Sequence, residues 1–328
     1  MRNSSLLDRI HRRSRSGRSR PGRHRRRQML TPRMEHLEDR RLLAVWSGTL
    51  NSDTTWTNAE VQEVSNDLRV ATGVTLTVEP GTVVKFHHAN AHLFVDGTLD
   101  AQGTAVDNII FTSLLDDVGG DTNNDSGDSS PGPGNWAQIE VNGTATISHA
   151  QVRYGGHFFG SQIEVNGGDL TLSDSTISHS ETNGVRIVDS DSLLTGNTYS
   201  NNNGAAISMN LNSNPTISGV DVSGNGINGL QVDTGTLVKN LTWNNPDIVY
   251  RPNDNITVPA GITLTINAGQ IVKPAHVNVH LYVDGTLNIA GTASDPVVFT
   301  SLADDTRGGD TNGDASATTP GQIGRAHV

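Results

Sequence analysis

The sequence predicts an all-β fold, a β-solenoid in which short parallel strands stack turn upon turn. Its composition is 34% hydrophobic and only 4% aromatic, with 35 glycines among 328 residues, which favours many short strands and turns over helices. Apolar residues recur every 22 to 25 residues in the middle of the chain, and one long segment occurs twice. Repetition at these lengths is typical of solenoids, whose turns bury their apolar faces only against one another.

Residues 1–45 form a basic leader that differs from the rest of the chain. They hold 14 of the 23 Lys and Arg residues and four acidic residues, whereas the remainder holds nine basic and 30 acidic residues. The stretch "HRRSRSGRSRPGRHRRR" predicts a disordered processing or targeting segment. Nucleic-acid binding is the alternative, but the body lacks interleaved basic and aromatic residues, so we expect no nucleic-acid partner.

Several classes of protein are disfavoured by simple absences. The chain has no cysteine, which rules out disulfides and thiolate metal sites. No apolar run approaches the roughly 20 residues of a membrane span, and "LLAVW" is too short for an ordinary secretory signal.

The segment "MEHLEDRRLLA" carries a sorting pattern. Leu37, Glu38, Arg40, Leu42 and Leu43 are spaced as in the LEPR-XLL segment of large planctomycete surface and secreted proteins, which this stretch resembles. Asp39 stands where that pattern has proline. The resemblance implies an exported, extracellular or cell-surface protein.

The long repeat defines the body, residues 46–328. Residues 74–117 and 262–305 are identical at 25 of 44 aligned positions, and the two copies extend to about 55–136 and 243–328. We expect the second copy to be truncated, because the final "IGRAHV" departs from the first copy and looks like translated adapter sequence. The chain is then expected to be part of a longer protein.

A finer period divides the body into turns of three strands. One series is Ile147, Leu172, Leu194 and Ile217, and a second is Val152, Ile177, Tyr199 and Val222. After Gly184, Gly204 and Gly229 the segments "VRI", "AAI" and "LQV" are expected to stack. At about 23 residues per turn, residues 50–320 predict 11 or 12 turns. Asparagine-rich stretches such as "NNNGAA" predict turns that bond to the neighbouring turn.

With rungs such as "GVTLTVEPGTVVKF", the body resembles right-handed parallel β-helix proteins of the pectin-lyase-like superfamily over about residues 50–320. The resemblance implies the fold. It leaves the activity open, because this fold hosts lyases, hydrolases, adhesins and spacers.

Two acidic loops are candidate calcium sites. "DTNND" and "DTNGD" place Asp, Asn and Asp at alternate positions, as in the first half of an EF-hand loop. The glycine and the glutamate that complete an EF-hand are missing, and solvated loops are the alternative. The candidate ligands are Asp116, Asp117, Asp121, Asn123, Asp125 and Asp128, and in the second copy Asp304, Asp305, Asp310, Asn312 and Asp314.

Evidence for catalysis in the sequence is weaker. His149, Arg153, His179 and Arg186 fall in the central turns and could form an acid–base site with Glu164 or Asp174. Their surroundings alternate like ordinary solenoid sequence, so we assign no catalytic residue. The repeated pair His88 and His92 would lie about 13 Å apart in an extended strand, too far to share one metal ion.

These observations favour a structural or adhesive surface protein with calcium in its acidic loops over an enzyme. The alternatives are a carbohydrate-active enzyme, either a polysaccharide lyase or a glycoside hydrolase, and a non-catalytic polysaccharide-binding module. The expected partners are polysaccharides or cell-surface components.

Overall fold

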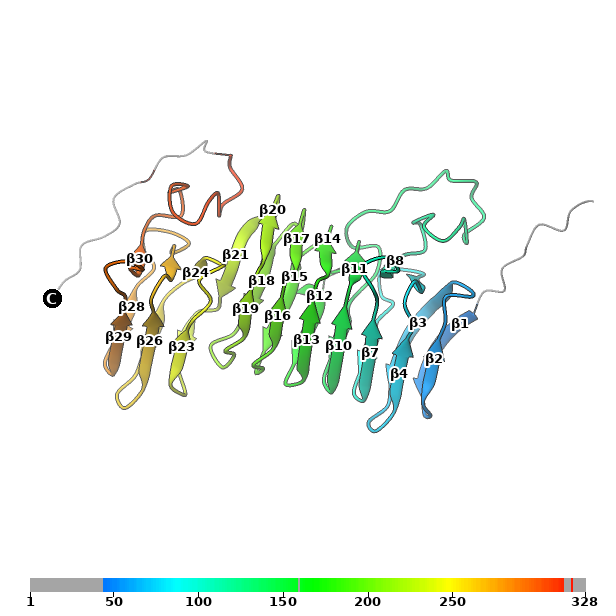
Figure 1. The fold of residues 1–328 in the computed structure, drawn as a ribbon, viewed down its shortest axis with the longest axis horizontal. Coiled ribbons are helices and arrows are strands. Elements are labelled where there is room, and N and C mark those ends of the chain that lie inside the picture. Colours follow the sequence, from blue (N-terminus) through cyan, green and yellow to red (C-terminus); the bar gives the residue numbers. More distant parts are fainter. Residues whose placement is uncertain (1–43, 159, 316–319, 321–328) are drawn as a thin grey trace, which may run out of the picture. The chain divides into compact units, whose positions relative to one another are not determined.

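The computed structural model describes residues 44–158, 160–315 and 320, in which all regular secondary structure is β-strand (Figure 1). The first strand, β1, begins at Ala44, so almost all of the predicted leader, including its sorting pattern, lies outside the described residues. The described residues contain no helix of the length and apolarity that crossing a membrane requires.

All strand pairs are parallel, and the strands stack in three rows. The 17-stranded sheet supplies rows A and B, and β1 (Ala44–Leu50) and β3 (Gln62–Val70) each run through both rows. Besides β3, row A consists of β5 (Val83–Phe86), β8 (Ile109–Ser113), β11 (Ala150–Arg153), β14 (Thr176–Ser178), β17 (Thr198–Ser200) and β20 (Asp221–Ser223). Row B continues with β6 (Leu93–Val95), β9 (Ile139–Val141), β12 (Ser161–Asn166), β15 (Asn183–Val188), β18 (Ala205–Met209), β21 (Ile227–Val232), β24 (Tyr250–Pro252), β27 (Ile271–Val272) and β30 (Val298–Phe299).

Row C is the 7-stranded sheet, and two 3-stranded sheets complete the second repeat copy. Row C contains β2 (Thr54–Trp56), β4 (Thr75–Val78), β7 (Thr98–Gln102), β10 (Thr144–Ser148), β13 (Asp169–Ser173), β16 (Leu193–Thr195) and β19 (Thr216–Ser218). The small sheets are β22 (Gly235–Thr236) with β25 (Ile256–Val258) and β28 (Leu281–Val283), and β23 (Leu241–Trp243) with β26 (Thr263–Asn267) and β29 (Thr286–Ala290). The strands make about 11 turns, which confirms the predicted solenoid.

The predicted periodicity is the pairing register of the strands. Ile147 pairs with Leu172, which pairs with Leu194, and the series ends at Ile217. These side chains are buried because inward apolar residues alternate with outward polar ones, as in β10, where Ala145 and Ile147 are enclosed and Thr146 faces out. Each buried aliphatic side chain stabilises the stack by about 1.5–3 kcal/mol.

The second predicted series is confirmed, and the third needs a correction. Val152, Ile177, Tyr199 and Val222 pair in order along row A. In row B, however, Val185 pairs with Ile207, so the expected alignment of "VRI" with "AAI" is wrong by two residues. The pairing of β18 with the following strand, β21, also contains a register shift, between Ala205 and Ile207, and residue spacing alone reveals neither irregularity.

Buried asparagines join one turn to the next, as predicted. The Nδ2 of Asn202 donates to the Oδ1 of Asn225 at 2.8 Å, and the Nδ2 of Asn225 donates to the carbonyl of Tyr199 at 2.9 Å. Both side chains are almost fully enclosed. They satisfy backbone groups that would otherwise be buried without partners at the corner between rows A and B.

Candidate functional site

Both acidic loops leave the solenoid directly after a strand of the repeated unit. The first spans residues 114–138 between β8 and β9, and the second follows β30 (Figure 1). Each begins with the same bond: the hydroxyl of Thr112 donates to Asp116 at 2.6 Å, and that of Thr300 donates to Asp304 at 2.5 Å. The two loops therefore start from equivalent positions in equivalent geometry.

A buried lysine holds each loop against the solenoid. The Nζ of Lys85, on β5, donates to the carbonyl of Gly120 at 2.7 Å and to the hydroxyl of Thr122 at 3.1 Å. The Nζ of Lys273, in the second copy, donates to Gly309 and Thr311, both at 2.8 Å. Both lysines are 0% exposed. Burial lowers the pKa of Lys85 from its ordinary value, and nearby carboxylates, Asp116 and Asp117 foremost, act in the opposite direction.

Three carboxylates gather in each loop. Asp117, Asp121 and Asp125 place one oxygen each within 4.8 Å of one another, and Asp305, Asp310 and Asp314 do the same in the second copy. We call these the first and second Asp triads. Their members are exposed or half-buried. The triads unite the ends of the D-x-N-x-D pattern with an aspartate that precedes it, a combination that can offer oxygen ligands to a hard cation.

The remaining predicted ligands have other roles. Asp116 accepts from the Nε of Arg153 at 2.9 Å, so an arginine already neutralises it. Asn123 donates its Nδ2 to Asp125 at 2.7 Å, as Asn312 does to Asp314. The exposed Asp128 donates its backbone N–H to Asp125 and is not a member of the triad. Asp304 accepts from Thr300 and Thr306, and the Thr300 bond is the main reason that its pKa lies below the ordinary value.

The central residues considered for catalysis do not form one constellation. His149 and His179 are turn residues with φ of 45° and 55°, at the row C–row A and row A–row B corners respectively. Arg153 and His179 both lie near the ring of Tyr154, but Arg153 is bound to Asp116.

Arg186 lies in row B, where two nitrogens of its guanidinium bind Asp233, the closer contact being 2.6 Å. Asp174 has a φ of 48° and occupies the position equivalent to that of His149 in the next turn of the solenoid. The same positive-φ conformation recurs from one turn of the solenoid to the next, so backbone geometry explains the positions of His149, His179 and Asp174.

The repeated histidines are in turns and not in a strand. His88 and His92 lie between β5 and β6, so the expectation of an extended segment there is wrong. The Nδ1 of His88 accepts from the backbone of Asn90 at 3.2 Å, and that of His276 accepts from Asn278 at 3.3 Å. Both histidines thus stabilise their own turn.

A ladder of one aromatic and three charged side chains on the outer face of row B is not apparent from the sequence. Phe94, Glu140, Glu164 and Arg186 occupy consecutive paired positions, which brings two glutamates onto adjacent strands. Burial raises the pKa of Glu164, the Glu140 carboxylate raises it further, and Arg186 acts in the opposite direction. Only the pairing register reveals that the two glutamates are neighbours, because in the sequence Glu140 and Glu164 are separated by the strands β10 and β11.

Comparison with known families agrees with this architecture. Residues 134–271 match the family described as right handed beta helix region, and residues 235–314 match the pectate-lyase like beta helix domain. Searches of curated proteins and of solved structures gave no match. Together with the stacked parallel strands, the family matches support a right-handed parallel β-helix body.

Proposed function

We propose that this chain is a structural β-helix protein of the cell surface or extracellular space, in which calcium stiffens two acidic loops. The observation that supports this proposal is the duplication of the loop construction. Lys85 and Lys273 anchor equivalent loops by equivalent bonds, and each loop carries an Asp triad. A catalytic centre is expected once in such a chain, whereas an anchored acidic loop that occurs twice in the same structural setting is typical of a scaffold.

The charge of the first triad favours a divalent cation. Among the described residues, no Lys, Arg or His forms an ion pair with Asp117, Asp121 or Asp125. The hydroxyl of Ser129 donates to Asp125 and is the main cause of the lowered pKa of that carboxyl, which is therefore ionised at neutral pH. Three neighbouring carboxylates repel one another, and a calcium ion, which prefers 6–8 oxygen ligands, would offset that repulsion.

Calorimetry of the full chain in calcium or in a chelator tests the proposal. At a calcium concentration 100 times the dissociation constant, each occupied site is expected to add about 2.7 kcal/mol to the stability of the state that binds it. The paired changes Asp121→Asn with Asp125→Asn, and Asp310→Asn with Asp314→Asn, should each remove part of the calcium-dependent rise in Tm. Asp128→Asn is the matched control, since this aspartate is in the same loop but outside the triad. An identical Tm in calcium and chelator would rule calcium out.

Surface location rests on the sorting pattern around Leu37–Leu43, which lies outside the described residues. Antibodies against the β-helix should label intact cells of the producing organism. Labelling that requires cell lysis would contradict export.

The row B ladder favours a second candidate function, action on or binding to an acidic polysaccharide. Glu140 and Glu164 are paired across adjacent strands, with Arg186 on the next strand. A pair of neighbouring carboxyl groups is the requirement for glycoside hydrolysis, and arginine is suited to bind a uronate.

A depolymerisation screen on acidic polysaccharides tests this candidate, with Glu164→Gln as the inactivating change and Gln231→Ala, further along the same ladder, as control. Activity that Glu164→Gln leaves unchanged would exclude the pair as catalytic. Saturable binding without cleavage would identify a binding module.

A further inference from the structure

The two acidic loops are connected through the interior of the β-helix. In Figure 1 both loops project from the same side, with the turns that contain β14, β17 and β20 between them. A series of buried side-chain amides crosses those turns near the corner between rows A and B. We call this series the amide network. Its members, each at most 8% exposed, are Gln162, Asn202, Asn225 and Asn228.

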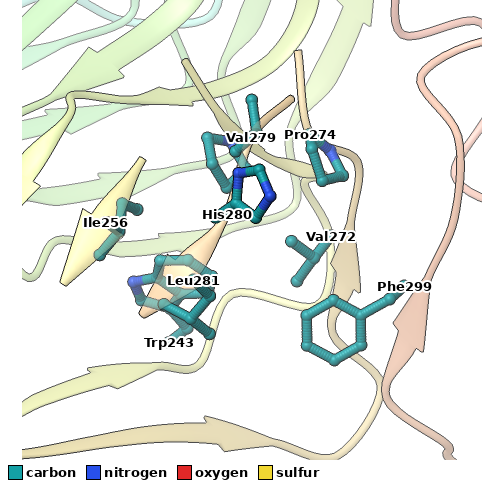
Figure 2. A pocket seen from close by; sticks show the side chains of 9 residues that line it. Trp243, Ile256, Val272, Pro274, Val279, His280, Leu281 and Phe299 are labelled. Atoms are coloured by element: carbon teal, nitrogen blue, oxygen red, sulfur yellow. The ribbon is translucent and has the colours of Figure 1, made fainter. Parts of the chain in front are cut away.

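At one end the amide network is bonded to the second acidic loop. The Nδ2 of Asn228 donates to the carbonyl of Asp310 at 2.9 Å, and its backbone N–H donates to the carbonyl of Thr311 at 2.8 Å. Thr311 is 0% exposed and is also bound by Lys273. Val272 lines the apolar pocket inside the β-helix (Figure 2), whereas its neighbour Lys273 reaches outward to the loop. The second loop thus packs on a corner 82 positions earlier in the sequence.

The amides between the two ends are bonded head to tail. The Nδ2 of Asn225 donates to the Oδ1 of Asn228 at 3.0 Å, and the Nδ2 of Asn202 donates to the Oδ1 of Asn225 at 2.8 Å. The longest bond, 3.5 Å, joins the Nε2 of Gln162 to the Oδ1 of Asn202. Each asparagine oxygen also accepts a backbone N–H, and since such a group can only donate, the orientation of all three amides is fixed. Every amide therefore donates toward the second loop.

At the other end the amide network reaches the first acidic loop. The Oε1 of Gln162 accepts from the backbone N–H of Gly155 at 3.1 Å, and the carbonyl of Gly155 accepts from the N–H of Gly134, in the first loop, at 3.2 Å. The adjacent Asn135 donates its N–H to the carbonyl of Tyr154 at 2.9 Å. A Cβ added to Gly155 would lie 2.9 Å from the Cβ of Gln162, so these two residues are in direct contact.

We propose that the amide network couples the two acidic loops, so that docking of either loop on its buried lysine favours docking of the other. Release of the second loop removes the acceptor of Asn228 and leaves a buried amide without a partner. Because bonded amides polarise one another, the loss weakens the bonds that follow, as far as Gly134 in the first loop. Coupling of this kind is reciprocal. One consequence, cooperative binding of calcium, rests on the function proposed above, whereas the coupling itself does not.

Amide hydrogen exchange of the full chain in a chelator tests the coupling without calcium. Lys273→Met releases the second loop and should raise exchange of residues 132–137 and 153–157 about 3- to 10-fold. Strands β10 and β13 lie in row C, away from the amide network, and their exchange should not change. Arg307→Gln, at an exposed position of the second loop, is the control and should leave all four segments unchanged.

Asn225→Ala interrupts the amide network in its middle. In that background Lys273→Met should no longer change the exchange of residues 132–137. The same response with and without Asn225→Ala would overturn the proposal, and so would faster exchange that includes β10 and β13, which indicates general destabilisation. An unchanged first loop in Lys273→Met alone would also overturn it, so the test stays decisive if Asn225→Ala unfolds the corner.

Calorimetric titration with calcium separates this inference from the proposed function. Binding of calcium to the full chain should be positively cooperative, and Asn225→Ala should make the two Asp triads bind independently. Absence of calcium binding would contradict the proposed function, and the exchange experiment would then decide the coupling. Two sites that bind calcium independently in the wild type would contradict the coupling alone.

Discussion

Lys85 is the residue on which the first acidic loop depends most directly. It is enclosed, and its ammonium donates to Gly120 and Thr122 of the loop. Lys85→Met should lower stability by about 2 kcal/mol and Tm by about 4–8 °C, because the carbonyl of Gly120 loses a charged donor. Limited proteolysis should then cut within residues 114–130 faster than in the wild type.

Lys239→Met is the matched control for Lys85. Lys239 is exposed and its nearest carboxylate, Asp191, is 3.9 Å away, so the substitution should change Tm by less than about 1 °C. Equal effects of the two substitutions would show that the loop does not rely on Lys85.

Glu164 should make stability depend on pH in a direction opposite to most carboxylates. Its folded-state pKa is raised, chiefly by burial and then by Glu140, so the folded state binds the proton more tightly than the unfolded state. The stabilisation from protonation is complete below the unfolded pKa and is lost as pH rises through the folded pKa. Glu164→Gln should therefore raise Tm by about 1–3 °C at pH 7 and have little effect near pH 4. A lower Tm at pH 7 would mean that attraction to Arg186 outweighs burial.

At the scale of an element, the corner between rows A and B depends on the asparagine ladder. Asn225 binds Asn202, Tyr199 and Asn228 while almost fully buried. Asn225→Ala should cost about 2–4 kcal/mol in urea unfolding, since it leaves several backbone and amide groups without partners. Asn203→Ala changes an exposed asparagine of the same corner and should cost less than about 0.5 kcal/mol. Similar losses for both would argue against the ladder.

The strands were largely predictable because one physical requirement, apolar residues facing inward in every turn, leaves a readable spacing. Ile147, Leu172 and Leu194 carry that spacing, and their register follows from it. The spacing fails in row B, where Val185 pairs with Ile207 and not with Ala205, because a change of register alters the pairing without altering the composition.

The candidate site was predictable only in part. The D-x-N-x-D spacing identifies Asp121 and Asp125, which the structure places together. It does not show that Asp116 binds Arg153, since those residues are 37 positions apart and meet only through the turns. Recurrence marks Lys85 and Lys273 as equivalent, but the carbonyl groups that they bind are known only from the folded loop.

At the scale of the whole β-helix, the two repeat copies can be compared directly, because nearly the same sequence is enclosed in the first copy and exposed in the second. Residues 93–111 are covered by the turns that follow them, whereas residues 281–299 include Tyr282, Val283 and Ile289, each 40–50% exposed. Intrinsic exchange rates of the two segments are similar, so differences in amide hydrogen exchange report their neighbours. We expect residues 281–299 to exchange at least about tenfold faster than residues 93–111.

Equal protection of the two segments would mean that the last turns are already closed. The stability of any turn is then set as much by what stacks on it as by its own sequence, as expected for a solenoid stabilised by contacts between neighbouring turns.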